Sequence, residues 1–468
     1  MKIYNSLTRQ IEEFAPLKPP KVGMYTCGPT VYDYVHIGNF RTYTTADFLV
    51  RLLKQDGYEV RYVINLTDVG HLTGDNLGDA DLGADRMEES ARRAGKSAYE
   101  IAEFYTRQFM IDAAKLNLVQ PDVWCKATDH IAEQIELVQK LETKGFTYRT
   151  SDGIYFDTAK FPRYGELSSL DEIDFGARVE MNPGKKNPRD FALWKFSPKN
   201  EKRQMEWDSP WGVGFPGWHI ECSAMSMKYL GESFDIHTGG EDLRSTHHPN
   251  EIAQSEAASG KPFVRYWVHG AFVLVDGGRM SKSLKNNYTL SDLEKKGFSP
   301  MALRYLYLTA HYRSPLNFTW SSLTGAQTVY DKLVGFIRAA RSPQLVTRST
   351  ISKEKLKKLD QYRSRFWEAV NNDLNFPQAL AVVWEMVKSN ISDRDKLDLL
   401  LDFDQVLGLD LANVGAIEVP EAVKQLAAER EQIRKAGKFV EADDMRMQIE
   451  KMGYTVKDTA HGPHITPK

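Results

Sequence analysis

Residues 21–40 read KVGMYTCGPTVYDYVHIGNF and decide the fold. They open with an apolar, β-rich run at residues 21–27 and lead into a helix-like segment at residues 40–56. A second β-rich run follows directly at residues 60–66. Strand, helix and strand in this order form the unit of a parallel sheet, so the sequence predicts an α/β fold with a Rossmann-type domain. Because ligands bind beyond the carboxyl ends of such strands, chemistry is expected just after each run.

The pattern changes at residue 121, after which a helix at residues 131–144, short strands and polar loops are expected. Strand signals resume at residues 234–237 and 266–275, so the sheet domain is predicted to be interrupted by an insertion. Beyond residue 299 apolar residues recur at helical spacing, which predicts an α-helical C-terminal region. The expected units are the first half of the Rossmann-type domain at residues 1–120, a connective insertion at 121–205, the second half at 206–298, a helical bundle at 299–415 and a C-terminal segment at 416–468.

Length, charge and cysteine content narrow the class of protein. With 468 residues, the chain exceeds the size at which a single hydrophobic core stops growing. Its 61 basic and 63 acidic residues exclude the globally basic profile of many nucleic-acid-binding proteins. Three cysteines are too few for a disulfide framework. No stretch approaches the roughly 20 apolar residues of a membrane span, and the start has no signal-peptide pattern, so we expect a cytoplasmic protein.

The first motif that points to chemistry is HIGN at residues 36–39, between the first strand and its helix. A helix N-terminus presents unpaired N–H groups that suit a phosphate, and Gly38 would let a ligand approach the backbone. His36 could donate a hydrogen bond to a phosphate oxygen as charge develops there. Taken alone, the motif is more typical of an ordinary loop histidine beside a turn glycine.

The second motif is RMSKS at residues 279–283, which follows a predicted strand and the flexible pair Gly277 and Gly278. A mobile loop that carries Lys282 could close over a triphosphate and neutralise charge on the leaving pyrophosphate. An isolated stretch of this kind is by default a solvated basic loop.

The pairing of the two motifs favours the functional interpretation. A histidine-glycine turn at the first strand and a Met-Ser-Lys-Ser loop after the last are the signature pair of class I aminoacyl-tRNA synthetases, and the chain resembles that family. The resemblance implies ATP contacts for His36, Gly38, Asn39 and Lys282, with His36 and Lys282 catalytic. Asn39 stands where the family usually has a second histidine, and Arg279 replaces the usual first lysine. Asparagine keeps a donor and arginine keeps the charge.

A third set of residues could hold a metal ion. Cys27 ends the first strand, and Cys222 lies far along the chain in GWHIEC. His247 precedes Glu251 by four positions, so both lie on one helix face. Two sulfurs, one imidazole and one carboxylate form a plausible zinc set. Alternatively, the cysteines are small buried hydrophobes and the histidine caps a helix, and the residues alone leave both interpretations open.

Three segments narrow the resemblance to one branch of the class I family. MYTCGPTVYD at residues 24–33, GWHIEC at 217–222 and HHPNE at 247–251 are similar, residue by residue, to cysteinyl-tRNA synthetases, and the resemblance extends nearly from end to end. It implies one zinc ion with the ligands Cys27, Cys222, His247 and Glu251. The thiol of cysteine would join them as a thiolate. An apolar pocket would reject serine by only ~10²-fold, whereas zinc prefers soft sulfur, so an editing site becomes unnecessary.

Further pocket positions follow from the same resemblance. It implies an amino-acid and adenylate pocket lined by Thr67, Trp218, His219 and Asp242, with Gly239 and Asp242 also near ATP. From the residues alone, Trp218 could equally be core and Asp242 a turn residue. The stretch at residues 68–85 departs from the family's commoner acidic continuation.

The implied activity is that of a cysteine-tRNA ligase. L-Cysteine would attack the α-phosphate of ATP, activated by Mg²⁺, His36 and Lys282, and the terminal adenosine of tRNA(Cys) would then take the cysteinyl group. We expect a monomer without membrane attachment. The nearest alternative is an amino-sugar acceptor, as in mycothiol ligases, which the long C-terminal region disfavours. A small-molecule nucleotidyltransferase and a non-catalytic zinc or nucleic-acid-binding protein are more distant alternatives.

The C-terminal segment is expected to contact the anticodon. Helices are predicted at residues 421–435 and 439–452. The basic residues Arg430, Arg434, Lys435 and Lys438 lie around the break between them. Such cations can contact phosphates beside unstacked loop bases. Because acidic residues lie among them, a solvated helical hairpin that caps the bundle is the alternative.

Overall fold

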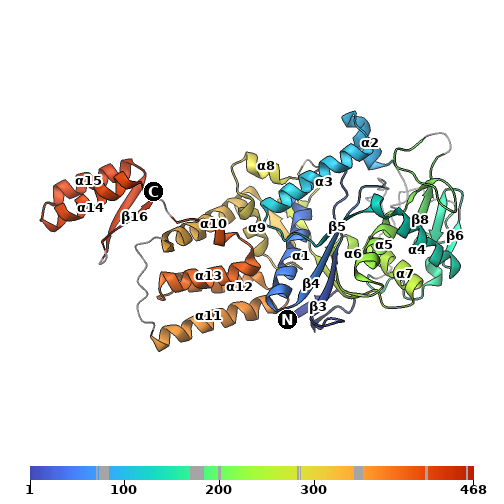
Figure 1. Cartoon of the computed structure of the whole chain (residues 1–468), viewed down its shortest axis with the longest axis horizontal. Helices are drawn as coiled ribbons and strands as arrows, with labels where there is room; N and C mark the ends of the chain where they lie inside the picture. The colour runs from blue at the N-terminus through green and yellow to red at the C-terminus, as the bar shows by residue number, and fades with distance from the viewer. Residues whose placement is uncertain are drawn as a thin grey trace.

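The computed structural model describes residues 1–69, 72, 84–168, 184–198, 202–281, 284, 286–341, 352–416, 420–459 and 462–467. Within this part of the chain, the central sheet has five parallel strands (Figure 1). Their order is β11 (Val264–Gly270), β10 (Phe234–Gly240), β3 (Lys21–Thr26), β4 (Glu59–Leu66) and β5 (Val123–Lys126). The predicted Rossmann-type parallel sheet is therefore confirmed.

Two distant parts of the chain build this sheet. β3 pairs with β4 on one side and with β10 on the other. Thr26 consequently lies beside Thr238, and their hydroxyl oxygens are 2.7 Å apart. The strands predicted at residues 21–27 and 60–66 are confirmed, and the sheet is interrupted in sequence as expected. The carboxyl ends of β3 and β10 thus meet at one edge.

The strand predicted at residues 266–275 is wrong in one respect, because it divides. β11 ends at Gly270, and β12 (Val273–Val275) belongs to another sheet with β13 (Gly278–Arg279) and β14 (Leu316–Phe318). Arg41 occupies the break, where its guanidinium donates to the carbonyls of Ala271 at 3.0 Å and Phe272 at 2.8 Å. The guanidinium of Arg41 thus satisfies the carbonyl of Ala271 and shares the carbonyl of Phe272 with the N–H of Leu316 in β14.

Helices pack around the central sheet. In chain order they are α1 (Ile37–Gln55), α2 (Arg86–Ala94), α3 (Ala98–Lys115), α4 (Ile131–Thr143), α5 (Trp218–Leu230), α6 (Leu243–Thr246) and α7 (His248–Ser259). α1 begins before the predicted residue 40, because His36 is its N-cap and its Nδ1 accepts from the N–H of Asn39 at 3.3 Å. The helix predicted at residues 131–144 is confirmed.

The insertion contains an antiparallel sheet. Its order is β6 (Thr147–Arg149), β7 (Gly153–Phe156), β8 (Phe191–Phe196) and β9 (Gly214–Pro216). β5 belongs to the central sheet although its residues fall within the range expected for the insertion, and β9 lies beyond that range. The division of the chain into five units stays a prediction.

The α-helical C-terminal region is confirmed. It comprises α8 (Leu290–Lys295), α9 (Pro300–Leu308), α10 (Trp320–Ala340), α11 (Lys353–Asn371), α12 (Phe376–Lys388) and α13 (Asp393–Leu407). These helices lie beside the sheet in Figure 1, and α13 packs against α1. An N-terminal hairpin, β1 (Lys2–Asn5) and β2 (Gln10–Glu13), meets the turn after α11. None of the described helices is long and apolar enough to cross a membrane.

The C-terminal segment forms a unit with its own small core (Figure 1). α14 (Glu421–Lys435) and α15 (Phe439–Lys451) confirm the predicted helix pair. They pack against a hairpin that was not predicted, β15 (Tyr454–Thr459) and β16 (Gly462–Pro467). The core consists of Val423, Ala427, Ile449, Val456 and Ile465. Because this cluster is separate from the main core, the segment is more than a hairpin that caps the bundle.

One cation predicted to contact phosphates is instead buried. Arg430 is 2% exposed, and its guanidinium donates to the two carboxylate oxygens of Asp458 at 2.6 and 3.2 Å. Arg434 also pairs with Asp458. Lys435 pairs with an acidic residue of α14, and Lys438 pairs with an acidic residue of α15. Arg430 therefore tethers α14 to β15 and is not available to a nucleic acid.

A buried ion pair joins the bundle to the sheet domain. Arg304 of α9 is 0% exposed and pairs with Asp47 of α1. The same guanidinium donates to the carbonyls of Leu116, after α3, at 2.9 Å and of Leu407, in α13, at 2.8 Å. Asp47 also accepts from Arg51 at 2.9 Å. One hydrogen-bonded guanidinium, that of Arg304, thus holds α1, α3, α9 and α13 together.

Replacing Arg304 by Ala should destabilise the protein, because the buried carboxylate of Asp47 would lose one of its cationic partners. Breaking a buried ion pair costs about 3–5 kcal/mol, so the urea midpoint followed by circular dichroism should fall. Arg107→Ala is the control, since it removes an exposed pair with Glu103 that is worth about 1 kcal/mol or less. Equal midpoints for the two variants would contradict the role of Arg304.

Candidate active site and metal centre

A cavity of about 240 Å³ lies where the ends of β3 and β10 face the start of α1. Among the predicted site residues, the lining contains Cys27, His36, Asn39, Trp218 and Asp242. A larger cavity of about 560 Å³ lies between the N-terminal hairpin and helices α11 and α12. None of the predicted site residues that the structure describes lines the larger cavity. The smaller cavity is therefore the candidate active site.

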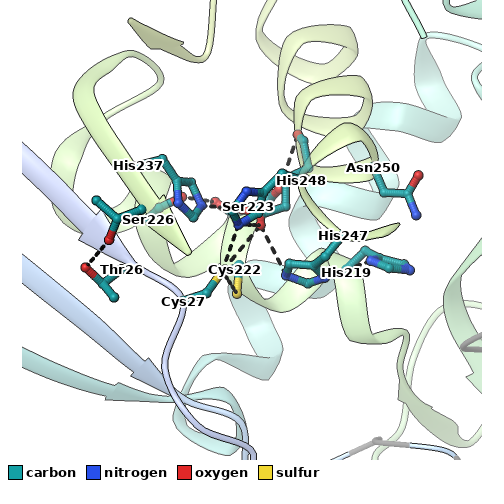
Figure 2. Close-up of polar contacts among 12 residues, drawn as sticks. Thr26, Cys27, His219, Cys222, Ser223, Ser226, His237, His247, His248 and Asn250 are labelled. Carbon is teal, nitrogen blue, oxygen red and sulfur yellow. Dashed lines mark hydrogen bonds and ion pairs between the residues drawn. The ribbon is translucent and has the colours of Figure 1, made fainter. Parts of the chain in front are cut away.

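Two sulfurs and a carboxylate form a buried cluster beside this cavity (Figure 2). Cys27 follows β3, and its Sγ lies 3.9 Å from Sγ of Cys222 in α5 and 3.7 Å from Oε1 of Glu251 in α7. Nε2 of His247, the residue before α7, lies 3.1 Å from the same carboxylate oxygen. The structure thus brings together the four residues predicted to bind zinc.

The buried charges of the cluster influence one another. Burial opposes ionisation of Cys222, but the hydrogen bond with Cys27 and the neighbouring His247 outweigh it and lower the pKa of this thiol to about 6. Burial and the same hydrogen bond raise the pKa of Cys27. Burial also opposes the charge of Glu251, yet His237 and His247 lower the pKa of this carboxyl to about 2. A thiolate beside a carboxylate makes the cluster attractive to a cation.

The donor atoms and their spacing fit a zinc ion. Ligand atoms bound at about 2.0–2.3 Å in a tetrahedron lie about 3.3–3.8 Å apart. Three of the distances between these ligand atoms are 3.1, 3.7 and 3.9 Å, and all four atoms lie within 4.8 Å of one another. Sulfur, imidazole and carboxylate are all ligands that zinc accepts. The geometry is therefore compatible with the predicted metal site.

Three histidines around the cluster were not predicted as site residues. Nε2 of His237, in β10, lies 2.9 Å from Oε2 of Glu251, and Nε2 of His248 lies 3.4 Å from Sγ of Cys27. His248 is in turn 2.8 Å from Nε2 of His269 in β11. With Cys27 and Glu251, His237 and His248 form a second possible donor set. The signal for His237 and His269 is a histidine at a strand position that the sheet places in the core, whereas His248 begins α7.

Aromatic and imidazole rings hold one ligand in place. Trp218, the first residue of α5, lines the cavity and stacks on His247 with the ring centroids 4.3 Å apart. Nδ1 of His219 lies 2.8 Å from Nδ1 of the same histidine. Trp218 and His219 thus both contact the candidate metal ligand His247, and Trp218 is more than plain core.

Two predicted pocket residues lie behind the lining of the cavity. Thr67 follows β4 and is 2% exposed, and its hydroxyl accepts from the amide of Asn65 at 3.0 Å. Gly239 lies in β10, where an added Cβ would come within 2.6 Å of the His248 ring. Its small size is needed for this close packing, and Gly240 lines the cavity instead.

The two signature motifs meet at the start of α1. An added Cβ on Gly38 would lie 3.0 Å from the His36 ring and 3.5 Å from Sδ of Met280, so Met280 of the RMSKS motif lies near the HIGN turn. His36 pairs with Thr289, beyond the same loop, in an isolated β-bridge. Lys282 lies outside the described residues. The flanks of its loop therefore lie against the HIGN turn.

Arg41, which was not predicted as a site residue, ties these parts together. It is 2% exposed, and its guanidinium donates to four backbone carbonyls. The acceptors are Ala271 at 3.0 Å, Phe272 at 2.8 Å, His311 at 3.0 Å and Ser314 at 2.6 Å. Two of these carbonyls precede β12, which leads to the signature loop. The signal in the sequence is a charged residue within an otherwise buried helical turn.

The chain matches three family models. Residues 13–328 match the model described as tRNA synthetases class I (C) catalytic domain. Residues 365–412 match the DALR domain, and residues 417–464 match the cysteinyl-tRNA ligase anticodon binding domain.

Curated relatives cover nearly the whole chain. A cysteine-tRNA ligase from Burkholderia lata is 47% identical over 474 aligned positions, which cover 99% of this chain and 96% of that protein. A cysteine-tRNA ligase from Treponema denticola is 42% identical and covers 98% of each chain. Among solved structures, methionyl-tRNA synthetase of Mycobacterium tuberculosis in complex with methionyl-adenylate has the same fold, with a TM-score of 0.58 and 15% identity over 83% of this chain and 88% of that chain. The chain therefore belongs to the cysteine-tRNA ligase family of class I aminoacyl-tRNA synthetases.

Proposed function

We propose that the chain joins L-cysteine to tRNA(Cys) in two steps, through a cysteinyl-adenylate made from ATP. The observation that carries this proposal is the buried cluster of Cys27, Cys222, His247 and Glu251 beside a cavity that the start of α1 also lines. A sulfur-rich site next to a helix N-terminus combines recognition of a thiol with binding of phosphates. Relatives that span nearly the whole chain are cysteine-tRNA ligases, which supports the same activity.

Cysteine would be recognised by its thiol. The four cluster residues would hold a zinc ion, which when bound selects the soft thiolate of cysteine over the hydroxyl of serine. We favour this set over the histidine-rich alternative, because its Cys222 has the lowered pKa and provides a thiolate near neutral pH. Trp218 and His219 both contact the ring of His247 and fix its orientation.

ATP would bind with its phosphates at the start of α1. The unpaired N–H groups and the dipole of a helix N-terminus favour a triphosphate, and His36 and Asn39 line the cavity there. Gly38 keeps this approach open. We assign to His36 and Lys282 the stabilisation of charge that develops on the phosphates, with Mg²⁺ accompanying ATP. Positioning and charge stabilisation suffice, so no nucleophilic side chain is required.

The C-terminal unit would contact the anticodon of the tRNA. Lys435 and Lys438 are exposed around the turn between α14 and α15, and Phe439 beside them is 62% exposed. An exposed ring next to cations can stack on an unpaired base while the cations contact phosphates. The helical bundle between this unit and the sheet would contact the stem of the tRNA.

The alternative of an amino-sugar acceptor is not favoured. The chain matches the anticodon-binding model over residues 417–464, and its alignment with the ligase from B. lata covers 96% of that protein. A cytoplasmic, monomeric enzyme stays a prediction.

Replacing Cys222 by Ser should release the metal and abolish cysteine-dependent exchange of pyrophosphate into ATP, because an alcohol is a much poorer zinc ligand than a thiolate. Cys125→Ser is the matched control, since Cys125 is also buried but lies in β5, outside the cluster. Metal analysis should find one zinc ion per chain in the control and almost none in Cys222→Ser. Full zinc in the Cys222 variant would contradict the assignment.

A chain that ends at residue 414 should keep cysteine-dependent pyrophosphate exchange, because the cavity and the cluster lie elsewhere and the C-terminal unit has its own core. Its Michaelis constant for tRNA should rise at least about tenfold, which corresponds to ~1.4 kcal/mol of lost binding. Steady-state charging kinetics measure this, with circular dichroism as the check on folding. Undiminished charging by the folded, shortened chain would show that the unit does not recognise tRNA.

A further inference from the structure

Three aromatic rings form a continuous surface beside the candidate active site. We name this surface, made of Tyr34, Phe104 and Tyr105, the aromatic shelf. Tyr34 precedes α1, whereas Phe104 and Tyr105 are neighbours on α3. The ring centroid of Tyr34 lies 6.2 Å from that of Phe104 and 5.1 Å from that of Tyr105, and the rings meet edge to face. Two segments distant in sequence thus build one surface.

The aromatic shelf is exposed and begins at the cavity. Tyr34 is 45% exposed and Phe104 is 38% exposed. Tyr34 also lines the cavity that contains Cys27 and His36. Large aromatic side chains that contact one another in solvent are unusual unless a ligand or partner covers them. The shelf therefore extends the candidate active site outwards.

Cations border the aromatic shelf. Nζ of Lys96 lies 5.5 Å from the centre of the Phe104 ring. Burial and Asp33 raise the pKa of Tyr105, and the positive charge of Arg93 opposes that rise, which places Arg93 within electrostatic range of the shelf. Both Lys96 and Arg93 are exposed. This side of the shelf therefore attracts an anionic partner.

Acidic residues near the aromatic shelf already have partners. Asp33 accepts from the N–H of Tyr34 at 2.8 Å. Glu100 caps α3 by accepting from the N–H of Ser97 at 2.8 Å. Glu103 pairs with Arg107 at 2.8 Å. The ion pair with Arg107 offsets the charge of Glu103, whereas Asp33 and Glu100 are hydrogen-bonded but keep their negative charges.

We infer that the aromatic shelf binds the unpaired 3′ end of the tRNA, with bases stacked on Tyr34 and Phe104 and phosphates near Lys96 and Arg93. The inference rests on the proposed function, because the 3′ end must reach the cavity to accept the cysteinyl group. Aromatic faces stack on any base, and neighbouring cations attract the backbone. A single-stranded end offers unpaired bases to such rings, whereas a duplex keeps its bases paired.

Binding of tRNA transcripts tests this inference. Phe104→Ala should raise the Kd of an intact transcript about tenfold, the expected loss of one stacked base. It should leave the Kd of a transcript that lacks its unpaired 3′ nucleotides unchanged, because that RNA does not reach the aromatic shelf. Phe104→Tyr keeps a stacking ring and should bind the intact transcript as tightly as the wild type.

Tyr99→Ala is the matched control. Tyr99 is 52% exposed on the same helix, and within the described residues its ring contacts none of the three shelf rings. Overturning results would be no loss in Phe104→Ala, equal losses for both transcripts, or the same loss in Tyr99→Ala. Dissociation of a dimer by Phe104→Ala, seen in sedimentation, would assign the shelf to self-association and also overturn the inference. Cysteine-dependent pyrophosphate exchange by the wild type tests the proposed function separately, since it needs no tRNA.

Discussion

The buried carboxylate of Glu251 is the constraint on which the arrangement of the sheet domain's edge depends. It is 0% exposed, and a buried charge is tolerated only when it is paired and hydrogen-bonded. His237 and His247 take one oxygen each, at 2.9 and 3.1 Å, and Cys27 approaches to 3.7 Å. These partners come from β10, the start of α7 and the end of β3. Satisfying one charge therefore fixes two strands and a helix, and the same packing places Cys27 in the lining of the cavity.

α1 connects this edge to the rest of the molecule. Its start is the HIGN turn, Arg41 in its second turn binds the segment before β12, and Asp47 pairs with Arg304 of the bundle. Arg41 also contacts the loop at residues 311–314. Arg313 of this loop donates at 2.5 Å to Asp373, which lies in the turn between α11 and α12. Buried hydrogen bonds thus set the position of the HIGN turn relative to the bundle.

The sequence predicted what depends on local patterns and missed what depends on packing. Most bounds of helices and strands could be predicted from strand-forming runs and helix caps, because a few neighbouring residues determine each of these signals. Cys27 and Glu251 are 224 residues apart, and the packing of α7 against the sheet brings them together. From the sequence, only the family resemblance grouped them. His237 and Arg41 were missed, since a polar residue within a buried element acquires meaning only from its partners. Arg430 was misjudged for the same reason, because its charge does not reveal the carboxylate of Asp458.

We propose that the buried sulfur cluster beside the cavity selects a thiol substrate. Exchange of pyrophosphate into ATP, measured without tRNA and with either cysteine or serine, tests it most directly. We expect exchange with cysteine and a preference over serine well beyond the ~10²-fold limit of an apolar pocket. Exchange should be lost when zinc is removed and should recover when zinc is restored. Comparable exchange with serine, or undiminished exchange in zinc-free protein, would contradict it.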